Sequence, residues 1–202
     1  MIHRRSLLAS SALASLAAIV PLHAMAQSSK KDAVTLALTL EPPVLDPTAS
    51  ASSSIAEVTH YNIFETLTKI NPDGSVSPML AESWDVSPDL KTYTFRLRKG
   101  VKFHDGSEFQ ADAVKANFDR VTNKANGLKR YMLYQNIEKT EVVDPYTVRF
   151  TLKKPFSSFI NQLAHPAGVM ICPSTLANKT NKQIAFEPCG TGPYTLDKYN
   201  PS

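Results

Sequence analysis

Two pairs of segments alternate between polar and apolar residues, as strands with one buried face do. The first pair, residues 82–86 and 92–97, flanks a Ser-Pro-Asp turn, and its second member reads TYTFRL. The second pair, residues 137–143 and 147–152, turns at an Asp-Pro step, and its second member reads TVRFTL. Alternation with a period of two combined with a turn signal predicts two β-hairpins.

Other segments carry apolar residues at helical spacing. In residues 111–121 the apolar side chains recur every three or four positions, and Asp112 lies in the first turn, where it complements the helix dipole. Residues 53–64 and 157–163 show shorter versions of the pattern, the first entered through a run of serines. We predict helices in all three places.

Short apolar runs predict further strands. Residues 34–40, VTLALTL, are typical of a buried first strand that ends at Glu-Pro-Pro, and residues 101–103 and 169–171 predict two shorter strands. Asn71–Gly74 and His104–Gly106 are strong turn signals. Because strands and helices are mixed along the chain, the predicted class is α/β or α+β with one strand-rich sheet.

The first 26 residues have the three parts of a secretory signal peptide. Arg4 and Arg5 form a basic start, an apolar stretch too short for a comfortable membrane span follows, and Ala24-Met25-Ala26 is a small-residue cleavage site. The paired arginines leave open either the ordinary secretory route or the twin-arginine route. The residue directly after the cleavage site is Gln27 and not a cysteine, which argues against a lipid anchor. We therefore expect a soluble protein of a bacterial periplasm.

Charge and cysteine content narrow the possible partners. The formal net charge of the whole chain is +4, and its acidic and basic residues are interspersed, without the basic stripe that nucleic-acid binding requires. Nucleic acid is thus excluded as a partner. Cys172 and Cys189 are the only cysteines, and neither has metal-ligand or C-x-x-C spacing. They can pair as a disulfide, or each can be a small buried hydrophobic residue.

No motif in the chain predicts catalysis, a metal or a cofactor. His60, His104 and His165 are isolated in sequence, without the spacing that places two imidazoles on one helix face. His104 and Asp105 are neighbours at a turn, which favours turn chemistry over a catalytic pair. Gly190 and Gly192 precede a proline, which has no N–H to offer a phosphate. The residues alone predict a secreted α/β domain.

Several segments, taken in order, resemble one family, the periplasmic solute-binding proteins of peptide and nickel ABC importers, known as extracellular solute-binding family 5. The segments are EPPVLDP at 41–47, the long string at 64–106, ADAVKANFDR at 111–120, the string at 142–166 and GTGPY at 190–194. Within the family, residues 125–145 and 156–173 most resemble the members that bind glutathione. Cys172 and Cys189 are not hallmarks of the family.

The resemblance implies a bilobal fold of the type II periplasmic-binding-protein kind, of which this chain holds part of the first lobe. It implies a signal peptide at 1–26, the start of the first lobe at 27–48, an inserted subdomain at 49–168, and a return to the first lobe at 169–202. Gly190, Thr191 and Gly192 would form that return. The chain would then end before the second lobe, as part of a longer record or as a truncated product that is degraded.

The resemblance also implies a function and a ligand wall. We expect a monomeric binding protein, not an enzyme, that passes glutathione or a short peptide to an inner-membrane ABC permease. Ser52 and Ser53 would lie along the ligand or cap a helix. Arg130 and Tyr131 would reach the cleft, or Lys129 and Arg130 would simply be solvated charges. Arg130 would bind a ligand carboxylate. The alternatives are a dipeptide or oligopeptide binder of the same family, or a secreted hydrolase.

Overall fold

The computed structural model describes residues 33–201 and divides the chain into two compact units, 1–37 and 38–202. Residues 33–37, the described part of the first unit, have no regular secondary structure and are exposed. The predicted signal peptide, residues 1–26, lies outside the described residues. In the described range no helix is long and apolar enough to cross a membrane.

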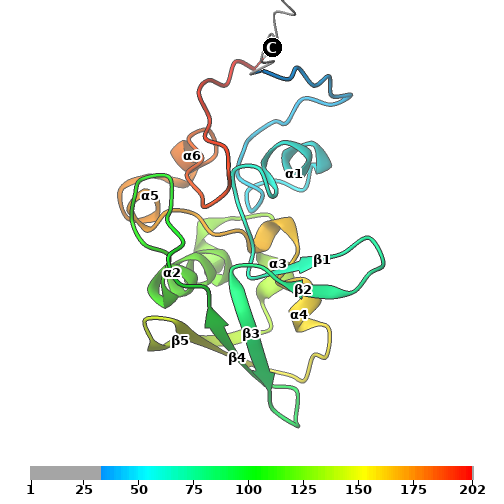
Figure 1. The fold of residues 1–202 in the computed structure, drawn as a ribbon, viewed down its shortest axis with the longest axis vertical. Helices are drawn as coiled ribbons and strands as arrows, with labels where there is room; N and C mark the ends of the chain where they lie inside the picture. The colour runs from blue at the N-terminus through cyan, green and yellow to red at the C-terminus, as the bar shows by residue number, and fades with distance from the viewer. Residues whose placement is uncertain (1–32, 202) are drawn as a thin grey trace, which may run out of the picture. The chain divides into compact units, whose positions relative to one another are not determined.

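The second unit is built on a four-stranded antiparallel sheet with the strand order β3-β4-β6-β5 (Figure 1). Its strands are β3 (Ala81–Val86), β4 (Thr92–Leu97), β5 (Ile137–Asp144) and β6 (Thr147–Leu152). The two predicted hairpins are therefore confirmed. The central pair, β4 and β6, joins them, with Tyr93 opposite Phe150 and Phe95 opposite Val148.

One face of the sheet is buried under α2 (Ala111–Thr122), which confirms the long predicted helix. The Phe118 ring of α2 meets the Phe150 ring of β6 edge to face, with centroids 4.9 Å apart. Alternate residues of β4, beginning with Tyr93, are buried against the same core. Gln110 stands at the N-cap of α2 without a side-chain capping bond.

A separate small hairpin, β1 (Thr68–Ile70) and β2 (Val76–Pro78), extends to one side of the sheet (Figure 1). Its turn is the predicted Asn71–Gly74, where Gly74 takes the left-handed conformation with φ 83°. The Thr68 hydroxyl donates to the carbonyl of Ile160 at 2.8 Å, which ties the hairpin to α4 (Phe159–Gln162). This helix lies inside the predicted range 157–163.

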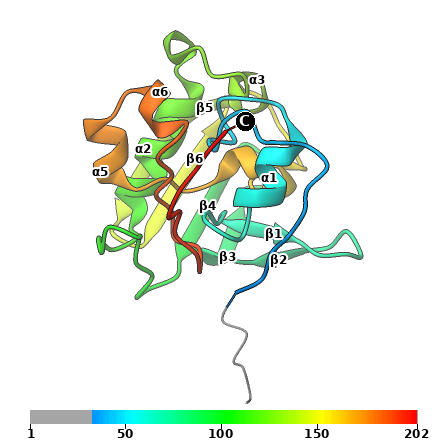
Figure 2. The same ribbon diagram turned by 90° about the horizontal axis from the view of Figure 1, so that it is seen from above.

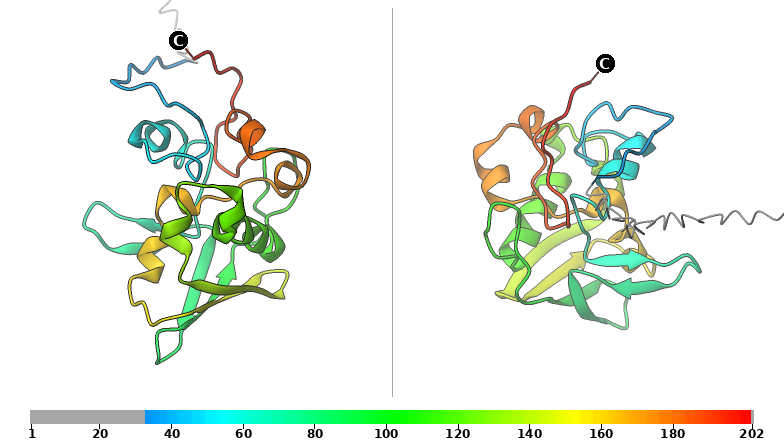
Figure 3. Two further views of the ribbon diagram at one scale, coloured as in Figure 1. Left: turned by 180° about the vertical axis from the view of Figure 1, so that it is seen from behind. Right: turned by 45° about the horizontal axis from the view of Figure 1, so that its top comes forward.

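Several short helices surround the sheet, with α1 and α6 on the side of the unit where the C-terminus lies (Figures 1 and 2). They are α1 (Ser53–Thr59), the 3-10 turn η1 (Lys124–Asn126), α3 (Tyr131–Tyr134), the 3-10 turn η2 (Pro166–Gly168), α5 (Pro173–Asn178) and α6 (Asn181–Ile184). Near this end the Tyr199 hydroxyl donates to the carbonyl of Pro42, and the two segments run close together when seen from behind (Figure 3).

Some predicted elements are wrong. Residues 34–40 form no strand, and Val34 and Leu36 are 81% and 79% exposed. A strand needs a neighbour to bond its backbone, and no described strand pairs with this segment. Residues 101–103 and 169–171 likewise supply only isolated bridges, Lys102 to Glu108 and Val169 to Thr66.

The first predicted helix is shorter than residues 53–64. It ends at Thr59, and Tyr61 takes the left-handed conformation with φ 62°. This reversal turns Ile63 and Phe64 into a small buried cluster with Val169, Ile171 and Ile184. Burial of two apolar side chains outweighs continuation of the helix.

Candidate functional site

Ser52 and Ser53 lie at the start of α1. Ser52 is the N-cap residue, but its hydroxyl bonds the hydroxyl of Ser54 at 2.7 Å, and no cap bond from its side chain is present. Ser53 is exposed in the first turn. Neither serine caps the helix through its side chain, so the Ser53 hydroxyl in particular is accessible to another molecule.

Arg130 is bonded to the chain segment just before these serines. Its backbone N–H donates to the carbonyl of Thr48 at 3.2 Å, and its Nη2 donates to the carbonyl of Ala51 at 3.1 Å. Its Nε is buried and has no hydrogen-bond acceptor among the described residues. None of the ion pairs in the described chain includes Arg130. The guanidinium thus keeps donors for an anion from outside.

Tyr131 is the first residue of α3 and is half-buried. In the described part of the chain its hydroxyl has no hydrogen bond to Ser52 or Ser53. The structure therefore brings Arg130 to the serine segment but does not link Tyr131 to it. Tyr134, one turn later, is fully buried and donates to the carbonyl of Gln162 at 3.1 Å, so its role is in the core.

A buried ion pair that the sequence did not predict holds this wall in place. Nη2 of Arg120, on α2, lies 2.6 Å from the Asp46 carboxylate, and their side chains are 9% and 0% exposed. The same guanidinium donates to the Thr48 hydroxyl at 3.0 Å and to the Asn181 side chain at 3.0 Å. Thr48 is the residue whose carbonyl receives the Arg130 N–H. Nothing in the sequence marked the two charged residues as partners, because 74 positions separate them.

Two neighbouring histidines, His60 and His165, have lowered pKa values, and the second of them lies near Arg130. Burial, together with the charges of His165 and Lys69, lowers the pKa of His60 from 6.5 to about 4. Burial first and the Arg130 charge second lower the pKa of His165. His60 and His165 also line a hollow of about 490 Å³ with Tyr61, Ile70 and Phe156. Protonation of either histidine is opposed by the positive charges around it.

The predicted return segment, Gly190 to Tyr194, packs directly on residues 62–64. The Gly192 N–H donates to the carbonyl of Ile63 at 3.0 Å, and the Tyr194 N–H donates to that of Asn62 at 3.0 Å. A Cβ on Gly190 would lie 2.2 Å from the Ile63 carbonyl oxygen, and one on Gly192 would lie 2.4 Å from that of Asn62. Only glycine permits this approach. The Thr191 hydroxyl is buried without a described partner.

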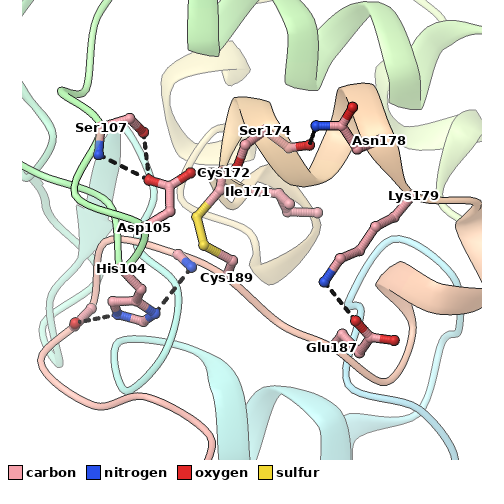
Figure 4. The surroundings of a disulfide bond; sticks show 12 residues. His104, Asp105, Ser107, Ile171, Cys172, Ser174, Asn178, Lys179, Glu187 and Cys189 are labelled. Carbon is pink, nitrogen blue, oxygen red and sulfur yellow. Dashed lines mark hydrogen bonds and ion pairs between the residues drawn. A yellow bond between two sulfur atoms is a disulfide. The ribbon is translucent and has the colours of Figure 1, made fainter.

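Cys172 and Cys189 form a disulfide with their Cα atoms 5.4 Å apart, immediately before the return segment (Figure 4). The Cys172 N–H also donates to the Cys189 carbonyl at 2.9 Å. Asp105 lies close to both sulfur atoms, in the only described cluster with spacing suited to a metal. Sulfur atoms joined to each other are not the thiolates that bind metals, so this cluster does not fit one.

His104 and Asp105 do not act as a pair. The His104 ring bonds the backbone of Gly190 and Gly192, whereas the Asp105 carboxylate accepts from Ser107 and from the Ser174 hydroxyl (Figure 4). Burial raises the pKa of Asp105, but the bonds from Ser107 and Ser174 outweigh it and hold that pKa below its usual value. A serine and an aspartate without an intervening imidazole give no proton relay.

The second unit is thus a mixed α/β unit in which Arg130 lies beside the serine segment. Residues 75–202 match the model of the bacterial extracellular solute-binding proteins, family 5, middle region. The match covers more than half of the chain, and the chain therefore belongs to this family.

Individual relatives narrow the comparison. The chain is 46% identical over 190 residues to the glutathione-binding protein GsiB of Shigella dysenteriae serotype 1, covering 94% of this chain and 36% of that protein. Among solved structures it is similar to NikZ of Campylobacter jejuni in complex with Ni(L-His), with a TM-score of 0.71 and 31% identity over 80% of this chain and 32% of that one. It is also similar to the periplasmic binding protein DppA of Helicobacter pylori in complex with the peptide STSA, with a TM-score of 0.69 and 32% identity over 78% of this chain and 35% of that one. The chain thus spans about a third of the length of its relatives.

Proposed function

We propose that this protein is the extracytoplasmic solute-binding component of an ABC importer, that it captures glutathione, and that it delivers glutathione to an inner-membrane permease. Membership of family 5 and the similarity to a glutathione-binding protein support this function. Capture, closure and delivery need no bond chemistry, in keeping with a binding protein rather than an enzyme or a secreted hydrolase.

The observation that carries the glutathione proposal is the state of Arg130. Arg130 is half-buried, its guanidinium makes one described hydrogen bond, from Nη2 to the Ala51 carbonyl, and it has no carboxylate partner in the described chain. A guanidinium binds a carboxylate through two parallel N–H bonds, and glutathione has two carboxylates. In this proposal Arg130 binds one of them, and the exposed Ser53 hydroxyl and Tyr131 lie on the same wall.

The domain assignment and location belong to the same proposal. Residues 1–26 would be removed as a signal peptide, residues 27–48 and 169–202 would belong to the first lobe, and residues 49–168 would form the inserted subdomain. The protein would work as a monomer in the periplasm. The similarity to DppA, which is described as a periplasmic binding protein, supports the location. Each lobe of such a protein supplies part of the ligand cage.

The test of this site is to titrate glutathione into Arg130→Ala in the product of the complete open reading frame. Loss of charge-assisted bonds is expected to weaken binding about 10- to 100-fold. Lys129→Ala is the matched control, because Lys129 is an exposed neighbour of the same charge, and it should change affinity less than about threefold. Equal losses in the two variants would show that Arg130 contributes only long-range charge.

A dipeptide or oligopeptide ligand is the second candidate, favoured by the similarity to DppA, whose structure contains a tetrapeptide. The two ligands are separated by titrating glutathione and di- and tripeptides in parallel. Tighter binding of ordinary peptides than of glutathione would select this candidate.

A further inference from the structure

His104 connects the two glycines of the return segment through its ring. The Gly190 N–H donates to Nδ1 at 3.3 Å, and Nε2 lies 2.8 Å from the carbonyl oxygen of Gly192. Figure 4 shows both interactions as dashed lines from the His104 ring. The His104 backbone N–H donates to the carbonyl of Gly190 at 2.9 Å. One residue therefore makes three hydrogen bonds to a turn of three residues, Gly190 to Gly192.

The two ring partners fix the protonation state of the imidazole. A backbone N–H can only donate, so Nδ1 must have a free lone pair to accept from Gly190. A carbonyl oxygen can only accept, so Nε2 must carry the proton that is donated to Gly192. Only the neutral imidazole with its proton on Nε2 satisfies both bonds. A second proton on Nδ1 would point at the Gly190 N–H, and the bond would be lost.

We propose that His104 is a pH-sensitive clamp on the return segment, closed when its imidazole is neutral and open when it is protonated. Opening would remove one of the bonds that hold Gly190 in place beside residues 62–64. The effect on ligand capture depends on the proposed function, namely on residues 190–194 being the return to the first lobe. The clamp itself does not.

Of the contacts around His104, the bond from the Gly190 N–H to Nδ1 is the one that protonation of the ring changes. The glycine turn and residues 62–64 contribute no carboxylate, amine, guanidinium or further imidazole. The charged residues on the His104 loop are Lys102, Asp105 and Glu108. The Asp105 carboxylate is already bound by Ser107 and Ser174, and on the side of α5, Lys179 and Glu187 pair with each other at 2.6 Å (Figure 4).

The disulfide confines any movement to the turn. Cys189 precedes Gly190 and is bonded covalently to Cys172 at the start of α5. The chain after the turn is held by the bond from the Tyr194 N–H to the carbonyl of Asn62. Opening of the clamp should therefore raise exchange at Gly190 without unfolding α5 or α6.

The test is amide hydrogen exchange of this chain, without ligand, at pH 7.5 and pH 5, with each rate divided by its intrinsic rate. The protection of Gly190 should fall about 2- to 10-fold at the lower pH, which corresponds to the loss of one hydrogen bond. The Leu152 amide, bonded to the carbonyl of Lys91 in the sheet at 2.8 Å, should keep its protection.

Two variants and one spectrum separate the clamp from general effects of pH. His104→Gln replaces the ring with an amide that offers a donor and an acceptor but does not titrate. The protection of Gly190 in this variant should therefore be independent of pH. His165→Gln, the matched control, should retain the wild-type dependence. Nitrogen chemical shifts of the wild-type ring at pH 7.5 should show a proton on Nε2 and none on Nδ1.

The proposal is overturned by pH-independent protection of Gly190 in the wild type, by pH dependence that persists in His104→Gln, or by a proton on Nδ1 at pH 7.5. If His104→Gln does not fold, the ring spectrum and the wild-type exchange still decide. Failure to bind glutathione would count against the proposed function and leave the clamp unaffected, because no ligand is present in these measurements.

Discussion

At the scale of single residues, the Arg120 ion pair holds the predicted ligand wall in place, and half-buried histidines affect the charge around it. Arg120 joins α2 to Asp46 and Thr48, and the Thr48 carbonyl in turn positions Arg130. Burial lowers the pKa values of His60 and His165, helped by the charges of His165 and Lys69 for His60 and by the Arg130 charge for His165. The sequence contained each of these residues, but it could not pair them, since their contacts join positions far apart in the chain.

Removal of Asp46 should be costly. Asp46→Ala leaves Arg120 as a buried charge without its carboxylate, so the free energy of unfolding should fall by about 3–5 kcal/mol. The control is Asp119→Ala on the same helix, whose exposed pair with Lys115 should contribute at most about 1 kcal/mol. Urea unfolding at pH 7 measures both. Similar losses for the two variants would contradict the importance assigned to the buried pair.

His60 should make the fold sensitive to acid. Its folded pKa, about 4, is below the ordinary 6.5, so the unfolded chain binds more protons between these pH values. Its contribution to stability is present above pH 6.5 and is lost as the pH falls toward 4. His60→Gln should therefore lose less stability between pH 7 and pH 5 than the wild type. The reason is that the wild type takes up as much as about one proton more than the variant on unfolding in this range.

The measurement is urea unfolding of both proteins across this pH range. If the two proteins lost stability equally, burial of the His60 ring would not be the source of the acid sensitivity. His165, whose pKa is also lowered, should leave part of the dependence in the variant.

At the scale of elements, the sequence predicted those whose pattern repeats over several residues. The hairpins β3–β4 and β5–β6 and the helix α2 each alternate or repeat long enough to be found. The helices α3, α5 and α6 have four to six residues, too few to show a period, and they form where buried side chains and caps such as the Thr180–Gln183 capping box hold them. Residues 34–40 have a strand pattern, but a pattern does not supply the neighbour that a strand needs.

The disulfide should stabilise the α5–α6 element. It closes a loop with a sequence separation of 17 residues, and on the chain-entropy account such a loop contributes about 3 kcal/mol. A double variant, Cys172→Ala with Cys189→Ala, should unfold at lower urea concentration than the oxidised wild type. Reduced wild type should approach the variant, and reductant should not affect the variant. Equal stability of the variant and the oxidised protein would contradict this role.

At the scale of the whole molecule, the family resemblance in the sequence agrees with the family match, whereas the ligand wall remains a proposal. The ordered segments between residues 41 and 194 were enough to indicate family 5, because a whole series of strings in order is far more specific than any single turn. The wall could be predicted only by analogy. Which donors of Arg130 are free depends on the Ala51 carbonyl and on the absence of a described carboxylate partner, and neither can be read from composition or spacing.

The most direct test of the account is calorimetric titration of glutathione into the product of the complete open reading frame, with di- and tripeptides as competitors. The account predicts saturable binding of one glutathione per protein that ordinary peptides displace only weakly. Binding of no peptide at all, or a clear preference for ordinary peptides over glutathione, would contradict it.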